Sequence, residues 1–161
     1  MEKELPVRKS PRLDRYDYSL NGAYFITVCV QDRHEMLGSI DVGAGSSRPH
    51  VELSEYGCIV NKWIAKIPEK YDCAKVENYI IMPNHTHILL FIYRSGRDNP
   101  APTVGNIIGY FKYQTTKEIN IPGFWQRSYH DRIIRDKAEY RQIWQYIDEN
   151  PARWAEDEFY K

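Results

Sequence analysis

The pattern of apolar and polar positions predicts strands in four parts of the chain. Residues 23–31 (AYFITVCVQ) are rich in aromatic and β-branched side chains, which is typical of a strand. Two more strands are predicted over 74–82 and 85–93, with Pro83-Asn84 as a tight joint between them. A short fourth strand is predicted within 125–134.

Three segments have the spacing of helices. Apolar residues recur every three or four positions in 53–70, and a second helix is predicted over 103–120. The third helix begins at Asp136, where Glu139 three residues later gives the spacing of a capping box. The apolar stripe of this last helix consists of Tyr140, Ile143, Trp144 and Ile147. A further helical turn is expected beyond it.

The order of these elements, β-α-β-β-α-β-α, predicts the fold class. It favours an α+β sandwich in which helices pack on a mostly antiparallel sheet of four to five strands. A length of 161 residues fits a single domain over 1–161. We expect 1–20 to be an N-terminal extension and 42–50, which is rich in Gly and Ser, to be a flexible loop or a hairpin insertion rather than a domain linker.

Composition adds few constraints. Hydrophobic residues make up 42% and charged residues 27%, which is ordinary for a globular protein. No apolar run is long enough to span a bilayer and no apolar leader is visible, so no membrane partner is expected and the cytoplasm is the expected compartment. Three cysteines without a CxxC pair indicate neither a disulfide framework nor a cysteine zinc site.

The charge balance is even overall but not along the chain. A net charge of zero argues against binding long duplex DNA through phosphate contacts alone. Residues 105–141, however, carry seven basic and four acidic side chains. A local basic region of this kind can bind a short single strand, and it equally fits a solvated surface.

The pair His85 and His87 is the first candidate for chemistry. Residues i and i+2 of a strand point to the same face, so the two imidazoles lie side by side with the spacing needed to chelate one metal ion. Two polar residues at a strand edge would share this spacing. The pattern therefore needs a third ligand before it specifies a metal site.

The last helix supplies a second candidate. Tyr146 lies to one side of the apolar stripe, and Asn150, four residues later, lies almost directly below it on the same flank. A phenol is a poor nucleophile until a metal polarises the phosphodiester it attacks, and an amide oxygen is a suitable hard ligand. A surface tyrosine and a helix-ending asparagine before Pro151 would look the same.

Three motifs, taken together, resemble a known family. They are residues 82–87 (MPNHTH), 124–135 (FWQRSYHDRIIR) and 146–151 (YIDENP). Their order and spacing resemble the single-tyrosine transposases, which are the insertion-sequence-200-like enzymes and especially the REP-associated tyrosine transposases of bacteria. The resemblance extends from about Tyr24 to Trp154.

The resemblance implies a fold, a reaction and a set of roles. This family belongs to the His-hydrophobe-His (HUH) endonucleases, which have a ferredoxin-like sheet covered by helices. By motif, His85 and His87 become metal ligands, Tyr146 the nucleophile and Asn150 the third ligand. The implied activity is cleavage and rejoining of single-stranded DNA near hairpins through a 5′-phosphotyrosine, with Mg²⁺ or Mn²⁺. Thr86 stands where relatives have a bulkier hydrophobe, and it still suits a strand.

The same resemblance indicates how DNA is held. Lysines and arginines of the basic region would contact phosphates, unless they are solvated or pair with Asp131 and Asp136. An aromatic residue there would stack on unpaired bases, although core packing is the alternative role for at least one of Phe111, Trp125 and Tyr129. The predicted DNA contacts are Lys112, Lys117, Trp125, Arg127, Arg132 and Arg135. Relatives act either as monomers or as homodimers that exchange their tyrosines, and both arrangements fit the sequence.

Other functions fit less well. A domesticated relative that binds hairpins without cutting them would need no tyrosine and metal-ligand set. A histidine-triad hydrolase requires another alternating histidine where Leu89 stands, and a two-histidine cyclic phosphodiesterase requires two separate His-x-Thr motifs. A structural zinc protein would have thiolate or charged ligands. The leading prediction is therefore a metal-dependent tyrosine transposase.

Overall fold

The computed structural model describes residues 22–41, 49–93 and 102–159. The predicted extension over 1–20 lies outside these residues, as does most of the predicted loop over 42–50. Within the described part of that loop, His50 is the first residue of a strand.

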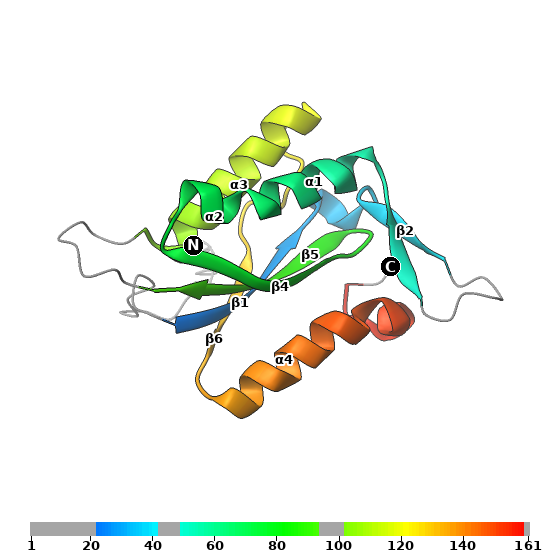
Figure 1. Ribbon diagram of the computed structural model, residues 1–161. Coiled ribbons are helices and arrows are strands. Elements are labelled where there is room, and N and C mark those ends of the chain that lie inside the picture. The colour runs from blue at the N-terminus through cyan, green and yellow to red at the C-terminus, as the bar shows by residue number, and fades with distance from the viewer. Residues whose placement is uncertain (1–21, 42–48, 94–101, 160–161) are drawn as a thin grey trace, which may run out of the picture.

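Four strands form one antiparallel sheet, as predicted. They are β1 (Gly22–Cys29), β4 (Ala74–Ile81), β5 (His85–Ile92) and β6 (His130–Ile134), in the order β4-β5-β1-β6. The central pair is therefore β1 and β5, which meet although about 60 residues separate them in the chain. Figure 1 shows this sheet between two layers of helices.

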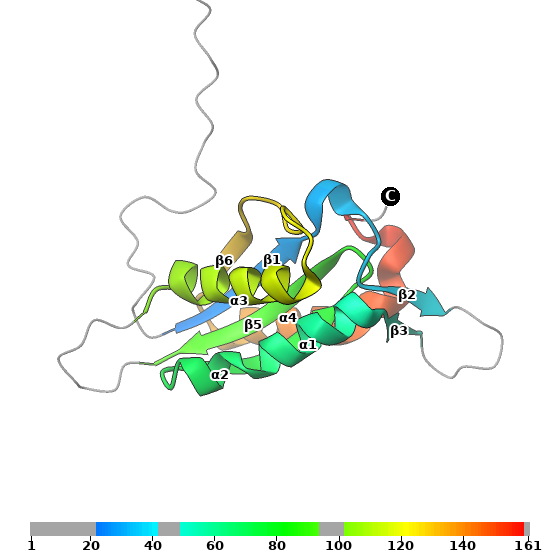
Figure 2. The same cartoon turned by 90° about the horizontal axis from the view of Figure 1, so that it is seen from above.

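The helices cover both faces of the sheet. Helices α1 (Glu55–Ala65), α2 (Ile67–Lys70) and α3 (Val104–Ile119) lie on one face (Figures 1 and 2). Helix α4 (Lys137–Glu149) lies on the other face and continues into a 3-10 turn, η2 (Asn150–Glu156). The observed architecture is the predicted α+β sandwich. None of the described helices combines the length and the apolar character required to cross a lipid bilayer.

Local signals fix most of the helix ends. The Ser54 hydroxyl accepts the backbone N–H of Gly57 at the start of α1, and Thr103 forms a full capping box with Asn106 at the start of α3. Asp136 caps α4 by accepting the N–H of Glu139. The predicted box at α4 is only half formed, because the Glu139 carboxylate accepts the N–H of Arg135 instead.

Two parts of the prediction differ from the structure. The helix predicted over 53–70 is two helices, because Pro68 lies in the first turn of the separate short helix α2. The hairpin alternative at the Gly/Ser stretch is the one observed, and its strands are β2 (Gly38–Asp41) and β3 (His50–Leu53), which were not predicted individually because each has only four residues. Gly57 lets this hairpin approach α1, because a Cβ there would lie 2.0 Å from the Leu37 carbonyl oxygen.

The two faces of the sheet carry cores of different size. The α1/α3 face holds a large apolar cluster that includes Tyr24, Ile88 and Phe111, all fully buried. The α4 face holds a small cluster in which Ile143 and Ile147 of α4 pack on Leu89. Trp144, predicted within the buried stripe of α4, is instead 36% exposed.

Candidate active site

Strand alternation directs the histidine pair toward α4. Along β5, Ile88 and Leu90 face the large core, whereas His85, His87 and Leu89 face the opposite side. Both imidazoles are buried, with exposures of 0% for His85 and 1% for His87. The joint before them is held in place, because the carbonyls of Pro83 and Asn84 accept backbone N–H groups of Leu37 and Val30.

The two imidazoles present their Nε2 atoms to each other at 3.0 Å. The Nδ1 atom of His85 lies 2.7 Å from the Asn84 amide oxygen. Because the Asn84 amide nitrogen donates to two backbone carbonyls, its oxygen is the acceptor, and His85 must carry its proton on Nδ1. The Nδ1 atom of His87 lies 2.8 Å from the Thr27 hydroxyl. With His87 in the tautomer that donates from Nδ1 to the Thr27 hydroxyl, both Nε2 atoms carry lone pairs that can bind a metal ion.

Burial keeps both imidazoles neutral. Desolvation, followed by the neighbouring His87 and Arg33, lowers the pKa of His85 to about 2. Desolvation alone lowers the pKa of His87 to about 3. Neutral imidazole is the form that binds metals, so the pair does not have to lose protons before it can act as a ligand.

Tyr146 lies directly beside this pair in the same chain. Its half-buried ring lies 5.4 Å from the His87 ring and 6.0 Å, edge-on, from the Phe25 ring, measured between centroids. Burial and the charge of Asp157 raise the pKa of Tyr146, and hydrogen bonding from Asn150 acts in the opposite direction. The phenol is therefore protonated at neutral pH.

Asn150 lies one turn below Tyr146, as predicted from their spacing. The residue is 1% exposed, and its amide nitrogen donates to Asp157 Oδ2 at 3.2 Å. The amide oxygen is buried and has no hydrogen-bond partner within the described part of the chain. A buried amide oxygen without a donor is costly, and a metal ion would satisfy it.

The C-terminal segment contributes residues that the sequence motifs did not indicate. After η2 the chain turns back, so that the ring of Phe159 lies 4.6 Å from the ring of His85. The carbonyl of Phe159 accepts from Asn84, and that of Glu158 accepts from Arg33. Asp157 brings a carboxylate oxygen to 3.9 Å from His85 Nε2. No motif spacing links this segment to β5, so its position was not predictable from the sequence.

The donor set fits a divalent metal ion. Ligand atoms of His85, His87 and Asp157 all lie within 4.8 Å of one another. With the orphaned oxygen of Asn150, they offer two imidazole nitrogens and two kinds of oxygen ligand. Imidazole and carboxylate together suit ions such as Mn²⁺, and oxygen ligands suit Mg²⁺.

A pocket of about 320 Å³ lies beside the histidine pair. It extends from Phe25 and Thr27 of β1 to the neighbouring strand β6. Two arginines line it, Arg132 of β6 and Arg33 of the turn after β1. One of them, Arg33, belongs to the turn η1 (Gln31–Arg33) and has a left-handed backbone with φ of 55°. The pocket is lined by Phe25, Thr27, Arg33, His130, Asp131, Arg132, Glu158 and Phe159.

The structure divides the predicted DNA contacts into two groups. Arg132 lines the pocket and pairs with Glu139 at 2.6 Å, while Lys117, Arg127 and Arg135 are exposed. The other two predicted contacts form hydrogen bonds within the protein and do not line the site. Lys112 donates to the carbonyls of Gln126 and Arg127. Trp125 is 5% exposed and donates to the Thr115 hydroxyl.

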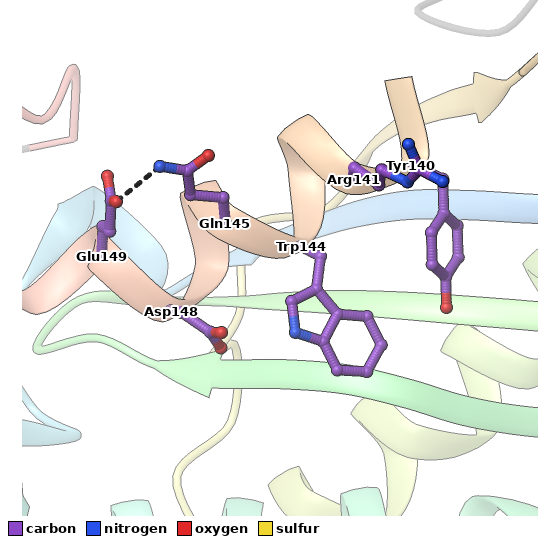
Figure 3. Close-up of a pocket in the computed structure, with 6 residues that line it drawn as sticks. All are labelled: Tyr140, Arg141, Trp144, Gln145, Asp148 and Glu149. Atoms are coloured by element: carbon purple, nitrogen blue, oxygen red, sulfur yellow. Dashed lines mark hydrogen bonds between the residues drawn. The ribbon is translucent and has the colours of Figure 1, made fainter. Parts of the chain in front are cut away.

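A second hollow, of about 370 Å³, lies along α4 (Figure 3). Trp144 lies there beside Tyr140, with ring centroids 5.9 Å apart, and Gln145 donates to Glu149. The lining residues are Tyr140, Arg141, Trp144, Gln145, Asp148 and Glu149. None of them belongs to the histidine and tyrosine cluster, so this hollow is separate from the candidate site.

Comparison with known proteins places the chain in a family. An uncharacterized protein of Haemophilus influenzae is 31% identical over an alignment 173 positions long, which covers 95% of this chain and 93% of that protein. The two proteins belong to one family. No protein-family model matches the chain.

Solved structures confirm the predicted fold. A REP-associated tyrosine transposase bound to a REP hairpin superposes with a TM-score of 0.66 and 19% identity, over 89% of this chain and 74% of the transposase. A candidate transposase from Deinococcus radiodurans R1 gives a TM-score of 0.50 and 16% identity, over 85% and 95%. The fold thus agrees with the resemblance to REP-associated tyrosine transposases that the sequence motifs indicate.

Proposed function

We propose that this protein is a metal-dependent DNA transposase that cleaves and rejoins single-stranded DNA near hairpins. The observation that carries the proposal is the position of Tyr146, whose ring lies 5.4 Å from His87 within the same chain. A phenol beside two metal-ready imidazoles is a constellation for attack on a phosphodiester. Hairpin binding alone would require neither group.

The proposed reaction exchanges one phosphodiester for another. The Tyr146 hydroxyl oxygen forms a bond to phosphorus, and the bond from phosphorus to the 3′ oxygen of the preceding nucleotide breaks. The phenol proton ends on that oxygen, so the products are a 5′-phosphotyrosine and a free 3′-hydroxyl. Attack of another 3′-hydroxyl on the phosphotyrosine rejoins the DNA and returns the proton to the phenol.

A divalent ion, Mg²⁺ or Mn²⁺, would act here as a Lewis acid that polarises the scissile phosphate. His85, His87 and Asn150 are the proposed ligands. Thr27 and Asn84 orient the two imidazoles by binding their Nδ1 atoms. Because burial raises the pKa of Tyr146, its proton has to leave as the bond to phosphorus forms.

The charged groups around the site support DNA as the substrate. Arg132 and Arg33 line the pocket next to His87, where each could pair with a phosphate oxygen. We propose Lys117, Arg127 and Arg135 as outer phosphate contacts, since all three are exposed. Since one chain holds both Tyr146 and the histidine pair, we propose that a monomer can carry out cleavage.

Covalent trapping tests the proposal. The full chain is incubated with a single-stranded DNA hairpin that carries its flanking strand, in buffer with Mn²⁺, and protein–DNA adducts are resolved under denaturing conditions. We expect an adduct with the wild type, none with Tyr146→Phe, and normal hairpin binding by both. Tyr113→Phe is the matched control, because Tyr113 is 63% exposed on α3 and outside the site.

Two outcomes would contradict the proposal in different ways. An adduct formed by Tyr146→Phe would show that another residue is the nucleophile. Hairpin binding by the wild type without any adduct, on flanking sequences taken from beside the protein's own gene, would favour the non-cleaving hairpin-binding protein.

A further inference from the structure

Asp157 is a buried carboxylate at the histidine pair. Its side chain is 1% exposed, and Oδ2 lies 3.9 Å from His85 Nε2. The same oxygen accepts the Asn150 amide at 3.2 Å, and Oδ1 accepts the backbone N–H of Phe159 at 2.8 Å. Both oxygens are thus positioned by hydrogen bonds, so the carboxylate is held in one orientation.

Within the described part of the chain, the ion pairs leave this carboxylate without a lysine or arginine. Among the described residues, no lysine or arginine forms an ion pair with Asp157, and its one ion-pair neighbour is His85. An isolated buried charge is strongly unfavourable unless a cation or several hydrogen bonds compensate it, and two hydrogen bonds from neutral amides are only partial compensation.

The distances between the histidine nitrogens and the Asp157 carboxylate allow them to bind one metal ion together. Bonds from a divalent ion to imidazole nitrogen or carboxylate oxygen are about 2.0–2.2 Å long, so two ligands of one ion lie at most about 4.4 Å apart. The two Nε2 atoms are 3.0 Å apart, and His85 Nε2 is 3.9 Å from Asp157 Oδ2. Both distances are within this reach.

The surrounding contacts hold Asp157 at this position. Its own N–H donates to the carbonyl of Trp154, and the ring of Trp154 stacks on His85 with centroids 6.0 Å apart. On the other side, Phe159 packs on His85 and its carbonyl accepts from Asn84 at 2.7 Å. The segment that carries Asp157 is therefore tied to the same strand end as the histidines.

We propose that Asp157 is a carboxylate ligand of the divalent ion, alongside His85 and His87. This inference rests on the proposed function and adds a charge to its site. The set His85, His87 and Asn150 is neutral, so it would bind a metal weakly until a DNA phosphate joined it. With Asp157 the protein itself supplies a negative charge, and the metal binds before DNA does.

Metal titration without DNA tests the inference. Metal-free full-length protein is titrated with Mn²⁺ in a calorimeter, and the wild type is compared with Asp157→Asn, Asp157→Glu, His87→Gln and Glu156→Gln. We expect one site in the wild type, an affinity loss of tenfold or more in Asp157→Asn, and partial recovery in Asp157→Glu. Glu156→Gln is the matched control, because Glu156 is exposed next to the site and should bind Mn²⁺ normally.

The results separate this inference from the proposed function. If His87→Gln loses Mn²⁺ while Asp157→Asn binds it as tightly as the wild type, Asp157 is not a ligand, although the histidine site stands. If the wild type binds no Mn²⁺ without DNA, the inference is also overturned, and adduct formation by Tyr146 then decides the proposed function independently.

A second measurement needs no substitution. Hydrogen exchange of the wild type is followed with and without Mn²⁺. Coordination by Asp157 would fix the segment around it, so exchange at the Asp157 and Phe159 amides should slow. Unchanged exchange at saturating Mn²⁺ would overturn the inference even if Asp157→Asn does not fold.

Discussion

The two faces of the sheet are held by different means. On the α1/α3 face, apolar side chains from both helices and three strands form a large continuous cluster. On the α4 face, the apolar contacts centre on Leu89, Ile143 and Ile147, and beside them lie polar groups joined by hydrogen bonds. The first face supplies stability, and this allows the second face to bury groups that are costly to desolvate.

The first prediction compares matched isoleucines on the two faces. Ile107 of α3 and Ile147 of α4 are 0% and 1% exposed. Truncating a buried isoleucine costs about 2–5 kcal/mol, depending on how far the surroundings relax. We expect Ile107→Ala to lose about 4 kcal/mol and Ile147→Ala about 2 kcal/mol in urea unfolding, because the thin α4 layer can collapse onto the gap. Equal losses would remove the distinction between the faces.

The second prediction concerns two threonines at adjoining strand positions. Thr27 binds His87 Nδ1, whereas Thr86 points away and donates to the carbonyl of Ile80. Loss of an outer hydrogen bond to a ligating histidine typically weakens metal binding about 10–100-fold. We therefore expect Thr27→Val to reduce Mn²⁺ affinity in a calorimetric titration. Thr86→Val should leave that affinity unchanged, and the opposite ranking would show that Thr27 does not orient His87.

The third prediction concerns acid stability of the metal-free protein. The folded pKa values of His85 and His87 lie near 2 and 3, below the ordinary value of about 6.5. The unfolded chain therefore binds more protons as the pH falls below about 6.5, and stability is lost by up to about 1.4 kcal/mol per pH unit for each histidine.

Urea unfolding in EDTA between pH 7.5 and 5 measures this loss. A variant in which both histidines are replaced by glutamine should have a shallower pH dependence than the wild type. His130→Gln is the matched control, because His130 is exposed at the pocket rim and lies outside the buried pair. A wild-type stability that does not change with pH would mean that the pair is protonated in the folded protein.

The smallest effect is expected at the outer side of α4. Trp144 is 36% exposed and contacts Tyr140 rather than the small core. Substitutions at exposed positions usually change stability by no more than about 0.5 kcal/mol. Trp144→Ala should therefore unfold at nearly the wild-type urea concentration. A loss above 1 kcal/mol would indicate that α4 is held from this side as well.

How well each part of the molecule could be predicted depends on how far apart in the sequence its contacting residues lie. The strand of His85 and His87 and the helix of Tyr146 and Asn150 were predicted because alternation and helical spacing are local properties. Trp144 was wrongly predicted to be buried. It lies four residues after Tyr140 and three before Ile147, so its spacing fits an apolar stripe as well as that of the buried Ile143 does. The hairpin β2–β3 was only an alternative to a loop, and its two strands were not placed, because four residues carry too little pattern.

The composition of the site was predictable only in part. His85, His87, Tyr146 and Asn150 lie in short motifs, but Thr27 reaches His87 through strand pairing across 60 residues. Asp157 reaches the site because the chain reverses after η2, and no sequence spacing predicts such a reversal. Trp125 was a predicted base contact because exposed and buried aromatic residues look alike in sequence.

The position of β1 at the centre of the sheet has a consequence for synthesis of the protein. This strand is made before its partners β5 and β6, which follow about 60 and 100 residues later in the chain. While the ribosome extends the chain, both hydrogen-bonding edges of an apolar strand stay open, which is the condition that favours pairing with other chains. We expect yield in cells to depend on growth temperature and on chaperones that cover extended apolar segments during translation.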